Sequence, residues 1–241
     1  MEKKKKIILI IVIVFGASFP FWISPLVESI QYDFRYGDGI IKANLCDVDK
    51  VNMTSKFRSC AGHPYPRSQD PMSTSSEKHY IALKYQYFED AAVDVKLYAI
   101  WDGTIEAITN DTGTIQVGKQ IHLSSAGWTA VYMHVDPLPS LQIGQRVMAG
   151  ELIGYCDVPY PPMNYTSFDI CIHRHRAFSD PGYSYFELMP DDIFAPWAAR
   201  GATKAALVIP ADVRTKNPCQ TGCTDNLLCY NVDPANWITL A

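Results

Sequence analysis

The chain has 241 residues, of which 48% are hydrophobic, and its formal net charge at pH 7 is -4. This length suits one sizeable domain with extensions, and the apolar content is sufficient for a packed core. Because the charge is mildly negative and no basic stripe lies beyond the extreme N-terminus, we expect no nucleic-acid partner.

The N-terminus carries the clearest local signal. Lysines at positions 3–6 precede an uncharged run from Ile7 to Ser24, and the next charge is Glu28. A membrane span needs about 20 apolar residues, and flanking lysines stay on the cytoplasmic side. Residues 1–28 are therefore predicted to form a signal-anchor or transmembrane helix, with the rest of the chain outside the cytoplasm, extracellular or periplasmic. The run lacks a good cleavage site, which favours an uncleaved anchor, whereas cleavage would secrete the protein.

Export gives meaning to the seven cysteines, because disulfides persist outside the cytoplasm. The odd count leaves at least one free thiol or one bridge between chains. Cys46 and Cys60 could close a small loop in an irregular lead-in, residues 29–78. Cysteines at positions 219, 223 and 229 predict a disulfide-stapled tail in a C-terminal extension, residues 177–241.

Short apolar stretches separated by turn residues occupy the middle of the chain. Asp102-Gly103, for example, is typical of a tight hairpin turn. No stretch here has the periodicity of a helix, so residues 79–176 are predicted to be an antiparallel β domain. A short helix over 190–200, ended by Gly201, and a late strand at 207–209 are expected after it. The predicted strands of the domain are 79–83, 93–100, 105–108, 114–123, 128–134, 141–147, 151–155 and 168–173.

Three stretches in this domain, taken together, resemble the lysostaphin/LytM-type zinc endopeptidases. They are Val95–Ile105, with its Asp-Gly turn, Val131–Asp136, with a Tyr-x-His pattern, and Ile143–Gly154, with paired glycine turns. Their order and spacing match over roughly a third of the chain. The resemblance implies a mainly β fold of the duplicated-hybrid-motif type, here with an N-terminal membrane helix and disulfide-stapled extensions. The third stretch alone also resembles biotinyl and lipoyl carrier domains, which need glycines at the same turns.

The resemblance implies a zinc ion. In this family the zinc is held by a His and an Asp spaced HxxxD and by the second His of an HxH strand. Three protein ligands leave the fourth position of zinc open for the attacking water. The first His of HxH and the His of Tyr-x-His would handle the proton and the oxyanion. The HxH spacing works because alternate residues of a strand point to the same face.

On this sequence the Tyr-x-His histidine is His134, a candidate catalytic residue. His79 is the candidate first zinc ligand, but the HxxxD partner position is Leu83, which cannot bind a metal. The family pattern is therefore incomplete on the first strand.

The HxH strand corresponds to Phe168–His173, where Asp169 and Cys171 are further candidate metal ligands. His173 is a candidate catalytic residue, and His175 a candidate ligand, because His173-Arg174-His175 has the HxH spelling. That motif lies several residues late and would need a longer preceding loop.

A site with too few anionic or imidazole ligands holds zinc poorly, so no cofactor is expected unless the site is intact, in which case it would be zinc. The sequence predicts a membrane-anchored LytM-like domain that is catalytically degenerate and binds a cell-wall component or an extracellular protein. One alternative is an active zinc metalloendopeptidase that cleaves peptidoglycan-type peptides. A second is a barrel-sandwich carrier or adaptor domain, although no lysine stands at a hairpin tip as carriers require.

Overall fold

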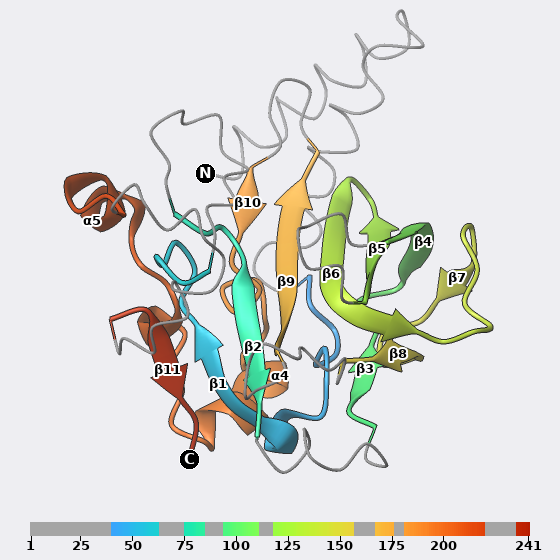
Figure 1. The fold of residues 1–241 in the computed structure, drawn as a ribbon, viewed down its shortest axis with the longest axis horizontal. Helices are drawn as coiled ribbons and strands as arrows, with labels where there is room; N and C mark the ends of the chain where they lie inside the picture. The colour runs from blue at the N-terminus through green and yellow to red at the C-terminus, as the bar shows by residue number, and fades with distance from the viewer. Residues whose placement is uncertain are drawn as a thin grey trace, which may run out of the picture.

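The computed structural model describes residues 40–62, 75–84, 94–110, 118–156, 167–175, 181–219 and 235–241. The described strands form one 11-stranded sheet, and every pairing between them is antiparallel. Its main path runs β11-β1-β2-β9-β6-β5-β4-β7, so that β2, β9 and β6 lie side by side at the centre (Figure 1). The strands are β1 (Val51–Ser55), β2 (His79–Leu83), β3 (Lys96–Tyr98), β4 (Gly103–Asn110), β5 (Lys119–Ser125), β6 (Trp128–Pro137), β7 (Arg146–Val147), β8 (Leu152–Tyr155), β9 (Ser167–Arg174), β10 (Gly182–Tyr183) and β11 (Trp237–Thr239).

This arrangement confirms the prediction of a mainly β, antiparallel fold. Each strand predicted between 79 and 173 overlaps an observed one, although several are shorter or displaced by a few residues at their ends. The helix predicted over 190–200 is α4 (Asp191–Ala198). In place of the strand predicted at 207–209, the chain forms η2 (Ala205–Leu207) and a single parallel bridge between Val208 and Phe57. Elsewhere in the described residues the helical segments are η1 (Val48–Lys50) and α5 (Ala211–Lys216).

The lead-in adds β1 to the sheet, and the C-terminal extension adds β10, which pairs with β9, and β11. β1 pairs with β2, and β11 pairs with β1 at the edge. The disulfide joins Cys60 to Cys219, which confirms a staple in the extension. The small loop expected between Cys46 and Cys60 does not form, because Cys46 is a buried free thiol that lies opposite Leu97 of β3.

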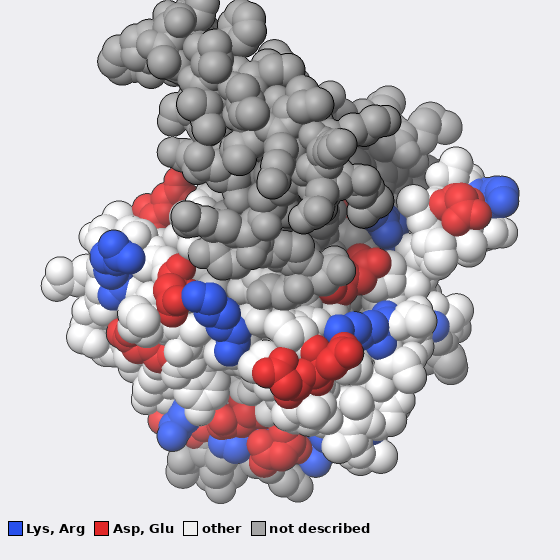
Figure 2. All heavy atoms as spheres, turned by 180° about the vertical axis from the view of Figure 1, so that it is seen from behind, with Lys and Arg blue, Asp and Glu red and all other residues white. Residues whose placement is uncertain are grey.

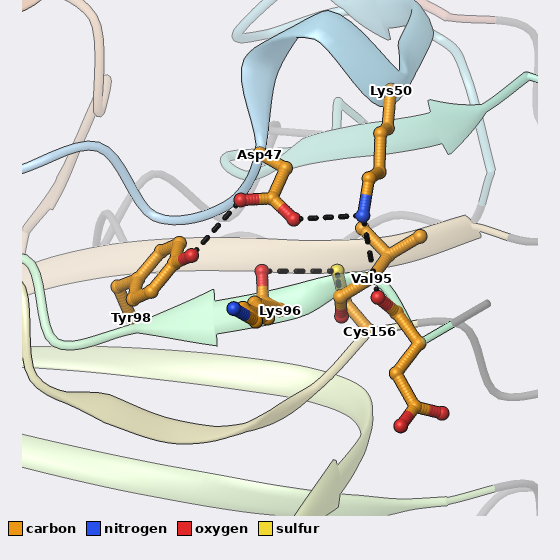
Figure 3. Close-up of polar contacts among 7 residues, drawn as sticks. Asp47, Lys50, Val95, Lys96, Tyr98 and Cys156 are labelled. Atoms are coloured by element: carbon orange, nitrogen blue, oxygen red, sulfur yellow. Dashed lines mark hydrogen bonds and ion pairs between the residues drawn. The ribbon is translucent and has the colours of Figure 1, made fainter.

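An ion-pair cluster fixes the lead-in against β3 (Figure 3). The Asp47 carboxylate accepts a hydrogen bond of 2.9 Å from the Tyr98 hydroxyl and lies 3.0 Å from the Lys50 ammonium. Partial burial alone would raise the pKa of Asp47, but its contacts with Lys50 and Tyr98 hold that pKa below its ordinary value. The Cys156 thiol, just after β8, donates a hydrogen bond of 3.3 Å to the Val95 carbonyl, just before β3.

The rear face of the molecule carries acidic and basic side chains interspersed among uncharged ones over its described part (Figure 2). Within the described residues no helix has the length and apolar character needed to cross a membrane. The predicted membrane segment, residues 1–28, lies outside the described residues.

Candidate functional site on the sheet face

The central strands present two different faces, because successive side chains of a strand alternate. On β9, Phe168, Ile170 and Ile172 belong to the main hydrophobic core. Asp169, Cys171 and His173 therefore point to the opposite face. We call that opposite face the site face; it carries Tyr80 and Ala82 of β2, Asp169, Cys171 and His173 of β9, and Val131 and Met133 of β6.

The centre of the site face is an ion pair between Lys78 and Asp169. The Lys78 ammonium lies 2.5 Å from Asp169 Oδ2, and the two side chains are 1% and 0% exposed. The same ammonium lies 4.5 Å from the centroid of the Tyr80 ring, at the distance of a cation–π contact. Burial alone would lower the pKa of the Lys78 ammonium, but the Asp169 carboxylate holds that pKa above its ordinary value. Lys78 is therefore a cation in the folded protein.

His134 reaches this ion pair through a β-bulge. Between β5 and β6 the register shifts, so that three steps along β6, from Tyr132 to Val135, match two steps along β5. His134 lies in the bulge with φ +61°, a left-handed conformation that non-glycine residues seldom adopt. A bulge of this kind re-aims a side chain. His134 Nε2 consequently lies 3.6 Å from Asp169 Oδ2, on the site face.

Contacts of Tyr132 and Gly118 hold the bulge in place. The Tyr132 hydroxyl accepts a hydrogen bond of 3.0 Å from the Ile100 amide and donates one of 3.2 Å to the Tyr98 carbonyl. Gly118, at φ +79°, approaches the bulge so closely that an added Cβ would lie 2.9 Å from the His134 carbonyl carbon. The tyrosine of the Tyr-x-His pattern is thus a core residue that anchors the strand two positions before the histidine.

His79, the expected first zinc ligand, lies on the core face instead. Its Nδ1 is 2.8 Å from the Ser55 carbonyl and its Nε2 is 2.9 Å from Ser184 Oγ, so both ring nitrogens are already engaged. The imidazole also packs edge-on against Phe186, with ring centroids 4.7 Å apart. Burial lowers the pKa of His79 to about 4, against the opposing effect of the hydrogen bond to Ser55. His79 is a neutral core residue and is not brought together with the other candidates.

The remaining candidates lie along β9 and just beyond its end. Cys171 is fully buried in a small apolar cluster with Val131 and Met133. The rings of His173 and His175 meet edge to face with centroids 5.0 Å apart, and His175 Nε2 is 3.1 Å from the Thr129 hydroxyl. The structure therefore groups Asp169 with His134, and His173 with His175.

These residues do not fit a zinc ion. A zinc site of the expected type needs three converging ligands. Among the residues that the structure describes, no group of three His, Cys, Asp or Glu side chains could hold a metal. His79 lies on the wrong face, Leu83 carries no ligand atom, and the Asp169 carboxylate already binds an ammonium.

Lys78 is the residue that sequence reasoning missed. The usable signal was the apolar alternation of Ile81 and Leu83, which places His79 on the core face in the same register. The neighbouring set at 78, 80 and 82 then faces the site. Histidine is a common zinc ligand and lysine is not, so the prediction selected His79 and passed over Lys78.

No protein-family model and no curated protein matches the sequence. Solved structures do match. The solution structure of lysostaphin is 17% identical, with 50% of this chain and 45% of lysostaphin covered and a TM-score of 0.35. The catalytic domain of lysostaphin from Staphylococcus simulans is 16% identical over 51% of this chain and 84% of that domain, with a TM-score of 0.35. One chain of the SpoIIQ–SpoIIIAH pore-forming complex is 15% identical over 69% of this chain and all of that one, with a TM-score of 0.44.

This chain therefore covers less than half of the lysostaphin chain in that solution structure. Several of the matched structures are described as lysostaphin or as a glycyl-glycine endopeptidase LytM, the type of protein that the three sequence stretches resemble.

Proposed function

We propose that the chain is a LytM-like module without peptidase activity, anchored by residues 1–28 outside the cytoplasm, that binds a cell-wall component or an extracellular protein. The observation that carries this proposal is the buried pair of Lys78 and Asp169 at the centre of the site face. An ammonium there supplies charge but has no open coordination position, so it cannot activate a water molecule as zinc does.

The disulfide between Cys60 and Cys219 supports the location outside the cytoplasm, because disulfides persist in oxidising compartments. The side chain of His134, 30% exposed, is the part of this cluster that a partner can reach. We place the contact with the partner at the His134 end of the site face.

The test combines hydrolysis and binding on the full chain. Purified peptidoglycan is incubated with the protein, with and without added zinc, and new amino termini are counted. We expect no release in either case, and we expect the protein to sediment with peptidoglycan or to crosslink to one extracellular protein. His134→Ala should weaken that binding without changing the fold. Val213→Ala, an exposed position on α5 outside the sheet, serves as the control that should bind as the parent does.

An active zinc endopeptidase is the second candidate, favoured by the contact of His134 with Asp169 on the same face as Cys171. It requires Lys78 to leave Asp169 and a metal to enter. Chelator-sensitive hydrolysis that disappears in His134→Ala would establish this candidate and overturn the binding module.

A further inference from the structure

Lys78 lies immediately before β2, on the side of the sheet that carries Asp169. Across the antiparallel β2–β9 ladder His79 pairs with Ile170 and Tyr80 with Asp169, and Lys78 directly precedes His79. Its contacts with Asp169 and with the Tyr80 ring place its ammonium on the site face. Lys78 and Ala82, four residues apart, therefore share that face with Tyr80 between them.

The HxxxD and HxH spacings described for the zinc peptidases both occur on this face, although the ligand residues do not. The first is Lys78-x-x-x-Ala82, and the second is Asp169-Ile170-Cys171. The apparent motif that begins at His79 is displaced by one residue onto the core face. A displacement by one residue moves every side chain of a strand to the other face.

We propose that the Lys78 ammonium takes the place of a metal ion at this site, as a built-in cation that positions Asp169 and, through it, His134. This inference rests on the metal-free module proposed above and names the residue that makes the metal unnecessary. The cation lies within ion-pair distance of Asp169 Oδ2, and His134 Nε2 lies 3.6 Å from the same oxygen. One carboxylate oxygen thus links the two basic side chains.

The buried charges of Lys78 and Asp169 compensate each other. Lysine is almost never fully buried unless it is paired, and a buried carboxylate needs a counter-charge in the same way. Both conditions hold here, with Lys78 1% and Asp169 0% exposed. The Tyr80 ring covers the ammonium from a second side. Lys78 is a positioning residue in this arrangement and takes no part in bond making.

Two sets of substitutions in the full chain separate the two registers. Lys78→His with Ala82→Asp and Cys171→His puts metal ligands at the positions on the site face. Leu83→Asp with Cys171→His completes the motif that begins at His79 and serves as the matched control. Cobalt(II) is the probe, because a tetrahedral site gives intense visible absorption and because uptake is counted against the parent, whose other cysteines provide the background.

We expect the first variant to bind about one cobalt(II) ion per chain more than the parent, with nitrogen and oxygen ligands. We expect the control to bind no more than the parent, since residues 79 and 83 face the core. Metal uptake by the control alone would overturn the proposal, as would a folded first variant that binds no additional cobalt.

A second comparison decides the matter if the first variant does not fold. Lys78→Arg keeps a cation beside Asp169, whereas Lys78→Met removes it. The NMR signal of the His134 side chain should therefore stay at its parental position in the arginine variant and move away from it in the methionine variant. Equal spectra for the two variants would overturn the proposal. Zinc-dependent hydrolysis by the parent would instead refute the proposed function, so the two failures are distinguishable.

Discussion

The Lys78 ammonium lies 2.5 Å from the carboxylate of Asp169, and both side chains are buried. Lys78 comes just before β2 and Asp169 from the middle of β9, so the pair joins two segments that are distant in sequence. Because His134 reaches the same carboxylate oxygen, this one contact organises the charged groups of the site face.

Removal of the ammonium should be costly. In Lys78→Met the Asp169 charge stays buried without its cation, and loss of one member of a buried pair costs about 3–5 kcal/mol. The double variant Lys78→Met with Asp169→Leu removes both charges and should recover most of that loss. Urea unfolding measures the free energies. A single variant that is as stable as the parent would show that the pair does not form.

His79 should make stability depend on pH. Its pKa falls from 6.5 to about 4 on folding, so between these values the unfolded chain binds a proton that the folded chain does not. The stabilisation from neutral His79 is complete above pH 6.5 and is lost as the pH falls towards 4. The loss amounts to about 3 kcal/mol. His79→Gln should lack this component when unfolding free energies at pH 7 and pH 4 are compared, and the same pH dependence in both proteins would contradict the neutral core histidine.

The bulge at His134 should depend on Gly118. In Gly118→Ala the new Cβ meets the backbone of the bulge at 2.9 Å, in addition to the strain of φ +79°. Gly144→Ala is the control, because φ is +85° there but no atom lies within 4 Å. We expect about 1–2 kcal/mol for the control and about 1–3 kcal/mol more for Gly118→Ala. Urea unfolding compares them, and similar losses would show that the bulge yields easily.

The cysteines should divide by reactivity. Cys60 and Cys219 are joined, whereas Cys46, Cys156 and Cys171 are buried thiols. An alkylating reagent should therefore label these three only after denaturation, and a peptide that contains Cys60 should be recovered linked to one that contains Cys219. Replacement of both linked cysteines by serine should cost about 2–5 kcal/mol. Rapid labelling of Cys171 in the native protein would contradict its burial on the site face.

The sequence predicted the fold better than the site, for a physical reason that these residues illustrate. Glycine turns and apolar alternation are local signals, and they located the strands that carry Asp169, Cys171 and His134. The faces of those strands depend on register. His79 in the core and Lys78 at the site are adjacent residues. The sequence prediction selected His79 because histidine is a common ligand, although the apolar alternation of β2 places it in the core.

Two other features have no local signal at all. The bulge that turns His134 towards Asp169 arises from the mismatch between β5 and β6, which involves residues 119–121 as well as 132–135. The partner of Cys60 is 159 residues away, so spacing favoured the nearer Cys46. Long-range pairings of this kind become visible only when the strands are assembled.

Zinc content is the most direct test of a site held by Lys78 instead of a metal. The full chain is loaded with excess zinc, desalted and analysed for metal, alongside Asp169→Asn as the control. We expect the parent and the control to retain equal zinc and to show the same unfolding midpoint with and without chelator. About one zinc per chain that is present in the parent, lost in Asp169→Asn and required for stability would contradict the account.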